Sequence, residues 1–167
     1  AHFSPLAKVQ MAVGIAYTGG RCRNRTRRPM TTLAQMTEDF TFLDDWEDRM
    51  RYVMEIGREL PDLPEADRTA ENKVKGCASQ VWLVTRPQEG KDPVIDFAGD
   101  SDAHIVRGLV AIVLAAYSGK RASEIVAFDA IELFSRLGLI EHLTAQRANG
   151  LRSMIQRIRE EAARHLV

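Results

Sequence analysis

Residues 72–84 have the sequence NKVKGCASQVWLV, and the stretch divides into two parts. Residues 72–77 are short, polar and basic, whereas residues 78–84 are rich in strand-forming side chains. Gly76 has no Cβ and can adopt the positive φ needed where a chain reverses. The stretch therefore predicts a turn that presents Cys77 immediately before a β-strand.

Cys77 is the only cysteine in the part of the chain that has the pattern of a folded domain. A cysteine after such a glycine lies beside the backbone N–H groups of the turn, and Lys73 and Lys75 add positive charge. These surroundings favour the thiolate, which is the reactive form of cysteine. A buried and inert cysteine fits the same local sequence, because Cys is among the most buried residue types.

Outward from this stretch, the strand over residues 78–85 is followed by a turn signal at residues 88–92 and a second strand over 94–98. This order predicts a β-hairpin. Val74 adds a shorter strand before the Cys77 turn. Because the strands are consecutive and helical patterns flank them on both sides, the sequence predicts an α+β fold with an antiparallel sheet of about three strands packed against several helices.

Helical periodicity precedes the sheet. Thr37 is the expected N-cap of the first helix, and Asp44 or Asp45 starts the second. Pro61 ends the second helix, and Leu63 is expected to pack back on the core.

Helical periodicity also follows the sheet. Ser101 is the expected N-cap of a strongly apolar central helix, with Asp102 in its first turn and Gly119 after its end. Short helices are expected over residues 123–127 and 130–137. The last helix starts near Thr144 and contains Gly150, a residue that costs helix stability but permits close packing.

Composition places the chain among ordinary globular proteins: of 167 residues, 45% are hydrophobic and 28% charged, and the net charge is zero. The charge is unevenly distributed, since residues 1–29 hold six basic residues and no acid. This first segment is predicted to be an extra basic segment, disordered or not native, so that a single domain covers residues 30–167. The longest apolar run, residues 109–117, is too short to span a membrane.

Several chemistries lack their sequence signatures. The four histidines have no metal-ligand spacing, and there is no CxxC, phosphate-binding glycine loop or GxSxG. Asp100-Ser101-Asp102 begins like a calcium loop but lacks the later ligands. His104 or His142 could pair with Cys77 as a nucleophile dyad, although sequence says nothing about their proximity.

Three blocks of this sequence, in order, resemble the SufE/CsdE family of sulfur acceptors. They are the cysteine motif at residues 72–82, the segment GDSDA at residues 99–103 with Gly108-Leu109 after it, and LIEHL at residues 139–143 with Thr144, Arg147 and Gly150. The resemblance extends from about residue 37 to residue 165. It implies a SufE/IscU-like fold of helices packed on a small antiparallel sheet.

The resemblance also implies a sulfur acceptor and activator of a cysteine desulfurase, SufS- or CsdA-like. Cys77 would accept persulfide sulfur from the desulfurase and relay it to a SufB-like iron–sulfur scaffold. The desulfurase carries the pyridoxal phosphate, so this chain is expected to need no cofactor and no metal. It would be a sulfurtransferase-like accessory protein in the cytoplasm, with no nucleic-acid or membrane partner, rather than a stand-alone enzyme.

The resemblance places the desulfurase contacts around the cysteine. The expected partner-binding residues are Lys75, Gly76, Ser79, Asp102 and Arg147. The Ser79 hydroxyl is also expected to hydrogen-bond the backbone of the turn. Two alternatives stay open: a Cys–His thiol enzyme, and an allosteric desulfurase activator in which Cys77 is only structural.

Overall fold

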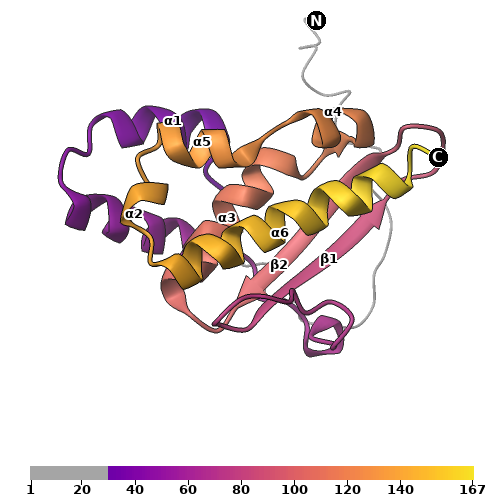
Figure 1. Cartoon of the computed structure of the whole chain (residues 1–167), viewed down its shortest axis with the longest axis horizontal. Helices are drawn as coiled ribbons and strands as arrows, with labels where there is room; N and C mark the ends of the chain where they lie inside the picture. The colour runs from indigo at the N-terminus through magenta and orange to yellow at the C-terminus, as the bar shows by residue number, and fades with distance from the viewer. Residues whose placement is uncertain (1–29) are drawn as a thin grey trace, which may run out of the picture.

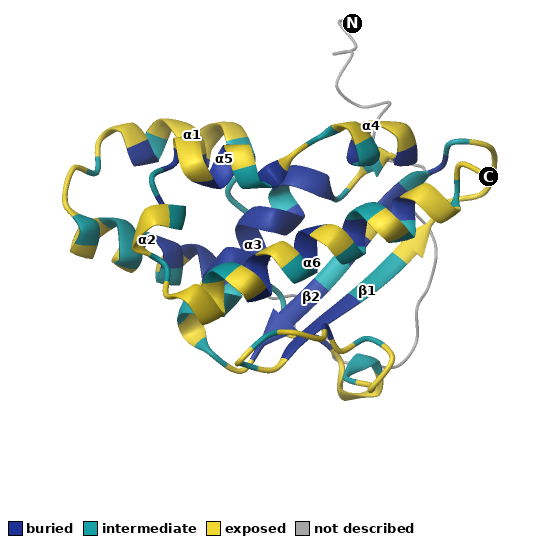
Figure 2. Ribbon diagram, in the orientation of Figure 1, coloured by how far each residue is buried: buried dark blue, intermediate teal, exposed yellow. Residues whose placement is uncertain are grey.

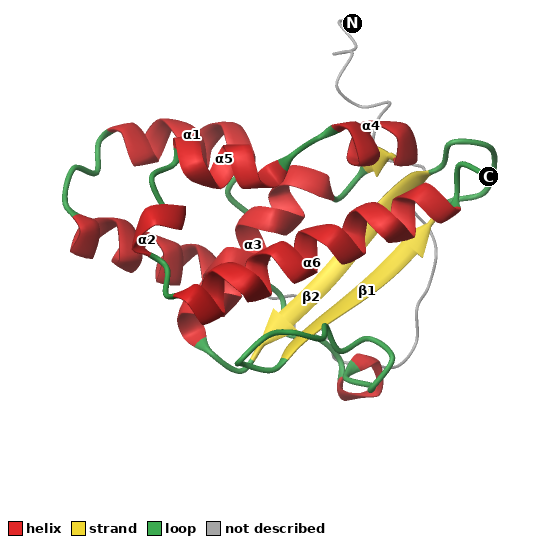
Figure 3. Cartoon of the chain, viewed as in Figure 1, coloured by secondary structure: helices red, strands yellow, loops and turns green. Residues whose placement is uncertain are grey.

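The computed structural model describes residues 30–167, and the predicted N-terminal segment 1–29 lies outside the described residues. The fold is α+β, as predicted, with helices gathered around a small antiparallel sheet (Figures 1 and 3). In chain order the elements are α1 (Leu33–Thr41), α2 (Trp46–Glu59), η2 (Glu65–Asp67), β1 (Val81–Pro87), β2 (Val94–Ser101), α3 (His104–Tyr117), β3 (Lys120–Arg121), α4 (Ala122–Ala127), α5 (Ala130–Arg136), η3 (Ile140–His142) and α6 (Ala145–Arg164).

The sheet has the order β1-β2-β3, and both pairings are antiparallel. The predicted hairpin is confirmed, because β1 and β2 pair in register from Val81 opposite Ser101 to Pro87 opposite Ile95. The third strand is not the one predicted at Val74. It is the two-residue β3 after α3, whereas the segment near Val74 contributes only an isolated bridge between Lys73 and Trp82.

The centre of the molecule is α3, which is buried along most of its length (Figure 2). It packs closely on α2 where Gly108 faces Gly57: a Cβ at Gly57 would lie 2.7 Å from the Gly108 nitrogen. Two glycines at one crossing bring the helix backbones together, and any side chain there would push them apart. On its other side α3 packs on β2 at Gly99, where an added Cβ would meet Val110 at 3.1 Å.

Two predicted helix starts are wrong. Ser101 is the last residue of β2 and not a helix cap, because its strand continues pairing with β1 to that point. Helix α3 starts after Ala103, and Asp102 stands outside it. Likewise α1 starts after Thr32, whose hydroxyl accepts the Gln35 N–H, and Thr37 lies inside the helix. Both mistakes have one cause: Ser, Thr and Asp favour helix caps and turns alike, so composition alone does not locate the helix start.

Other boundaries follow the predicted signals. Asp45 caps α2, Asp129 caps α5 and Thr144 caps α6, each through a side-chain oxygen that accepts a backbone N–H. Leu63 packs back on the core with 5% of its surface exposed.

A buried carboxylate fixes the segment that leads to Cys77. Asp100 has no exposed surface, and its Oδ2 accepts the Leu63 N–H at 3.2 Å and an Arg68 N–H at 3.0 Å. Arg107 lies 3.4 Å from the other carboxylate oxygen, and the Arg68 guanidinium also lies 5.0 Å from the centre of the Trp82 ring. Because a buried charge must be paired and hydrogen-bonded, this cluster ties residues 63–68 to the end of β2.

Candidate functional site: the Cys77 loop

Residues 75–79, called here the Cys77 loop, lie between two hydrogen-bonded anchors. On the first side the Val74 N–H donates to the Val81 carbonyl at 2.8 Å, which pairs this segment with the start of β1. On the second side the Gln80 N–H donates to Asp102 Oδ1 at 3.0 Å, and the Asp102 N–H donates to the Gln80 carbonyl at 3.3 Å. Within residues 30–167, the backbone of the Cys77 loop itself forms no hydrogen bond. The loop is therefore fixed at its ends and weakly held between them.

The chain reverses at Gly76, as the sequence predicts. Its φ is +86°, in the region that side chains disfavour, and a Cβ there would lie 2.8 Å from the Ser153 hydroxyl of α6. Gly76 is thus required both by its backbone angle and by its closeness to α6.

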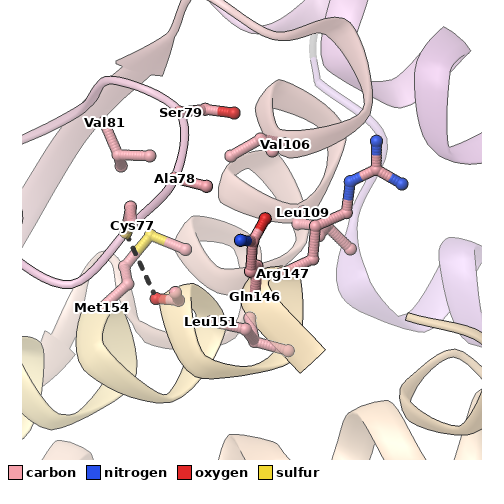
Figure 4. Close-up of a pocket in the computed structure, with 11 residues that line it drawn as sticks. Cys77, Ala78, Ser79, Val81, Val106, Leu109, Gln146, Arg147, Leu151 and Met154 are labelled. Carbon is pink, nitrogen blue, oxygen red and sulfur yellow. Dashed lines mark hydrogen bonds between the residues drawn. The ribbon is translucent and has the colours of Figure 1, made fainter. Parts of the chain in front are cut away.

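Cys77 rests on α6 at Gly150. Its Sγ lies 3.6 Å from the Gly150 carbonyl oxygen, which accepts a weak hydrogen bond from the thiol (Figure 4). A Cβ at position 150 would lie only 3.1 Å from Sγ. The close packing expected at Gly150 is confirmed, and the group that it admits is the thiol of Cys77.

The thiol borders a small cavity where the Cys77 loop, α3, α6 and the first residue of β1 meet. The cavity has a volume of about 20 Å³, enough for about one water-sized group. Its lining is mainly apolar and includes Val81, Val106, Leu109, Leu151 and Met154. A space of this size shelters the sulfur atom but is too small for an organic substrate.

The surroundings of Cys77 favour the protonated thiol at rest. Burial raises the pKa of Cys77, because a half-buried thiolate loses solvation. The expectation that Lys73 and Lys75 would favour the thiolate is therefore wrong for this position of the loop. Both lysines are exposed, whereas the sulfur lies against α6. Movement of the loop toward solvent would remove this desolvation and bring the pKa of Cys77 back toward its ordinary value.

The polar residues predicted to surround Cys77 differ in where they lie relative to the thiol. Ser79 and Arg147 both line the cavity, but the Arg147 guanidinium points away from Cys77 (Figure 4). The Ser79 hydroxyl forms no hydrogen bond with any described residue, so its expected bond to the turn backbone is absent. Asp102 holds the end of the loop through Gln80. The sequence had placed Asp102 in the first turn of a helix and did not indicate this contact.

Sequence reasoning missed Arg157 entirely. Its guanidinium donates to the carbonyls of Glu71, at 2.6 Å, and Lys73, at 2.9 Å, just before the Cys77 loop. No sequence signal pointed to this contact, because an arginine on a helix is usually solvated.

Within residues 30–167, no side chain that could act as a catalytic base lines the cavity beside Cys77. Among the described residues, no histidine lines the cavity, and His142 instead stacks on Trp46 with ring centres 4.1 Å apart. No group of three or more His, Cys, Asp or Glu side chains in residues 30–167 is arranged to hold a metal ion. Within residues 30–167, the site offers one sheltered nucleophile on a loop whose backbone forms no hydrogen bonds.

Comparisons with known proteins define the family. The model of the SufE domain, described as an Fe–S metabolism associated domain, matches residues 34–162. An uncharacterized SufE-like protein of Rhizobium meliloti (strain 1021) is 66% identical over 134 residues, which cover 80% of this chain and 96% of that protein. An uncharacterized SufE-like protein of Rhizobium etli is also 66% identical over 134 residues, with 80% and 90% covered.

The fold has a counterpart among solved structures. The solution structure of a hypothetical protein from Thermus thermophilus matches with a TM-score of 0.63 and 19% identity, covering 80% of this chain and 95% of that one. At this identity the likeness supports the fold alone.

The chain therefore belongs to the SufE family, and its role lies in iron–sulfur metabolism. None of the helices in residues 30–167 is long and apolar enough to cross a membrane.

Proposed function

We propose that this protein accepts sulfur on Cys77 from a cysteine desulfurase, a pyridoxal-phosphate enzyme, and relays it to an iron–sulfur scaffold. The observation that carries the proposal is the position of Cys77. Cys77 is the one cysteine within residues 30–167, and its thiol is held against Gly150 at an apolar cavity. It lies on a loop whose backbone forms no hydrogen bond between the two anchors.

The transfer step is an exchange between sulfur atoms. The Cys77 thiolate attacks the terminal sulfur of the desulfurase persulfide, and the bond between that sulfur and the desulfurase cysteine breaks. The electron pair leaves with the desulfurase thiolate, and Cys77 becomes a persulfide. No net oxidation or reduction occurs, so the step needs one accessible thiolate and neither a metal nor an external oxidant.

The resting geometry supports two states of the loop. Against α6 the sulfur is partly shielded and its pKa is raised, which disfavours the reactive thiolate. The cavity beside it has about the volume of one further small group, which matches the single sulfur atom gained in the reaction. Outward movement of residues 75–79 would expose Cys77 to the desulfurase site, and return would shelter the persulfide.

Two other functions remain distinguishable. A Cys–His thiol enzyme has no support among the described residues, because no histidine borders the cavity. An allosteric activator that receives no sulfur is the stronger alternative, since it would use the same surface.

The acceptor proposal includes an accessory role in sulfur transfer and a cytoplasmic location. It also includes two partners, a SufS- or CsdA-like desulfurase and a SufB-like recipient of the sulfur. The residues proposed to contact the desulfurase are Lys75, Gly76, Ser79, Asp102 and Arg147.

Desulfurase turnover in the presence of the protein separates acceptor from activator. With cysteine as substrate and limiting reductant, the parent protein should stimulate alanine formation, because Cys77 removes sulfur from the desulfurase. Cys77→Ser should bind the desulfurase but give no stimulation. Equal stimulation by Cys77→Ser and by the parent would show that the protein is an activator only.

A further inference from the structure

We propose that Arg157 is a positioning residue for Cys77, which keeps the Cys77 loop in its sheltered position on α6. The inference rests on the proposed function for its biological meaning. The structural claim stands on the contacts of Arg157 alone.

The first observation is the two-pronged hydrogen bonding of Arg157. One terminal nitrogen donates to the Glu71 carbonyl at 2.6 Å and the other to the Lys73 carbonyl at 2.9 Å. Within residues 30–167, no other donor reaches either carbonyl. Arginine presents its donors in a rigid planar arrangement. The one side chain of Arg157 therefore fixes both the distance between α6 and residues 71–73 and the orientation of these residues relative to the helix.

The second observation is that the α6 residues in contact with the Cys77 loop and its entrance lie on one face of that helix. Gly150 lies under Cys77, Ser153 lies against Gly76, and Met154 lines the cavity. Arg157 is seven residues after Gly150, which returns it to the same side of the helix after about two turns. The helix therefore provides both the surface on which the sulfur rests and the group that holds the loop entrance over that surface.

The third observation is that the loop has few other restraints. Asp102 holds the exit through Gln80, and the thiol itself makes only one weak bond, to Gly150. Without Arg157 the entrance would keep its pairing with β1, in which the Val74 N–H donates to the Val81 carbonyl and the Leu83 N–H donates to the Asn72 carbonyl. Among the described residues, it would lose its hydrogen bonds to α6. The outward position of Cys77 would then be populated more often, because the contacts that oppose it are fewer.

The test is the rate at which a small maleimide alkylates Cys77, measured with Arg157→Ala and Arg157→Lys. Arg157→Ala should react about tenfold faster than the parent, which corresponds to about 1.4 kcal/mol of lost preference for the sheltered position. Arg157→Lys should give an intermediate rate, because an ammonium retains the charge without the planar pair of donors.

Arg159→Ala is the matched control. Arg159 lies on the same helix two residues further, and it also donates to a backbone carbonyl, that of Val126 at 2.9 Å. That bond attaches α6 to α4 and leaves the Cys77 loop untouched. Arg159→Ala should therefore lower the melting temperature without raising the alkylation rate at temperatures well below melting.

An unchanged or slower alkylation rate in Arg157→Ala would overturn the proposal, as would an equal increase in Arg159→Ala. Sulfur acceptance is measured separately. If Arg157→Ala raises the alkylation rate but neither it nor the parent accepts sulfur, the acceptor function fails while the positioning role holds. If both accept sulfur and alkylate at the same rate, the positioning role fails while the acceptor function holds.

Discussion

Gly150→Ala tests the contact between the thiol and α6 most locally. The new methyl carbon would lie 3.1 Å from Cys77 Sγ and 3.5 Å from the Cys77 Cα and Cβ. Ordinary contacts of this kind lie near 3.5–4.0 Å, so the sulfur must withdraw by about half an ångström. Cys77 stands on a loop without backbone hydrogen bonds, and the loop can give way more easily than the helix.

Two effects on stability oppose each other in this variant. Alanine in place of glycine inside α6 favours the helix by about 1 kcal/mol. The crowded thiol and its weakened bond to the Gly150 carbonyl cost a similar amount. The melting temperature should therefore stay within about 4 °C of the parent value. The alkylation rate of Cys77 should rise about fivefold, because the sheltered position alone is disfavoured, by about 1 kcal/mol.

The assay compares maleimide alkylation of Cys77 with thermal unfolding followed by circular dichroism. Asn149→Ala is the control, because it improves helix propensity at an exposed neighbouring position of α6. It should raise stability slightly and leave the alkylation rate unchanged. If Gly150→Ala gained the full helix stabilisation and left Cys77 no more reactive than the parent, the thiol would not rest on Gly150.

Three further variants probe the rest of the account. Asp100→Ala should destabilise the fold by about 3 kcal/mol or more, measured by denaturant unfolding, because Arg68 is left without its buried partner; a loss below about 1 kcal/mol would contradict this role. Ser79→Ala should change neither the melting temperature nor the alkylation rate, since the hydroxyl forms no hydrogen bond in the described part of the chain, and a clear change in either would reveal a missing contact. Burial raises the pKa of the Cys77 thiol in the folded protein above the pKa of about 8.5 that a thiol has in an unfolded chain. The protonated, sheltered thiol therefore stabilises the fold fully below about pH 8.5, and this stabilisation is lost as the pH rises through the pKa of the folded protein. The melting temperature of the parent should consequently fall more steeply with alkaline pH than that of Cys77→Ser, and parallel pH profiles would argue against burial of the thiol.

Much of the fold was predictable because local signals and packing agreed. The alternating apolar pattern after Cys77 and the turn signal at residues 88–92 specified the hairpin. The continuous apolar pattern of α3 specified a central helix. The two-residue strand β3 could not be predicted, because its pairing depends on where α3 returns the chain and not on any strand pattern in Lys120-Arg121.

The candidate site divides in the same way. Gly76 and Gly150 were recognisable, since a glycine beside a reactive residue and a glycine within a helix each require a reason. The carbonyl groups that Arg157 binds lie more than 80 residues before it, so only the folded chain brings them together. The electrostatics were misjudged for a related reason. Lysines adjacent in sequence suggested a thiolate, whereas contact with distant α6 buries the sulfur and raises its pKa.

The central claim is that Cys77 itself receives the sulfur, and intact-protein mass spectrometry after incubation with a cysteine desulfurase and cysteine tests it most directly. The account predicts a mass increase of about 32 Da, corresponding to one sulfur atom, which is reversed by reductant and absent in Cys77→Ser. The same increase in Cys77→Ser, or no increase in the parent while it still stimulates the desulfurase, would contradict the account.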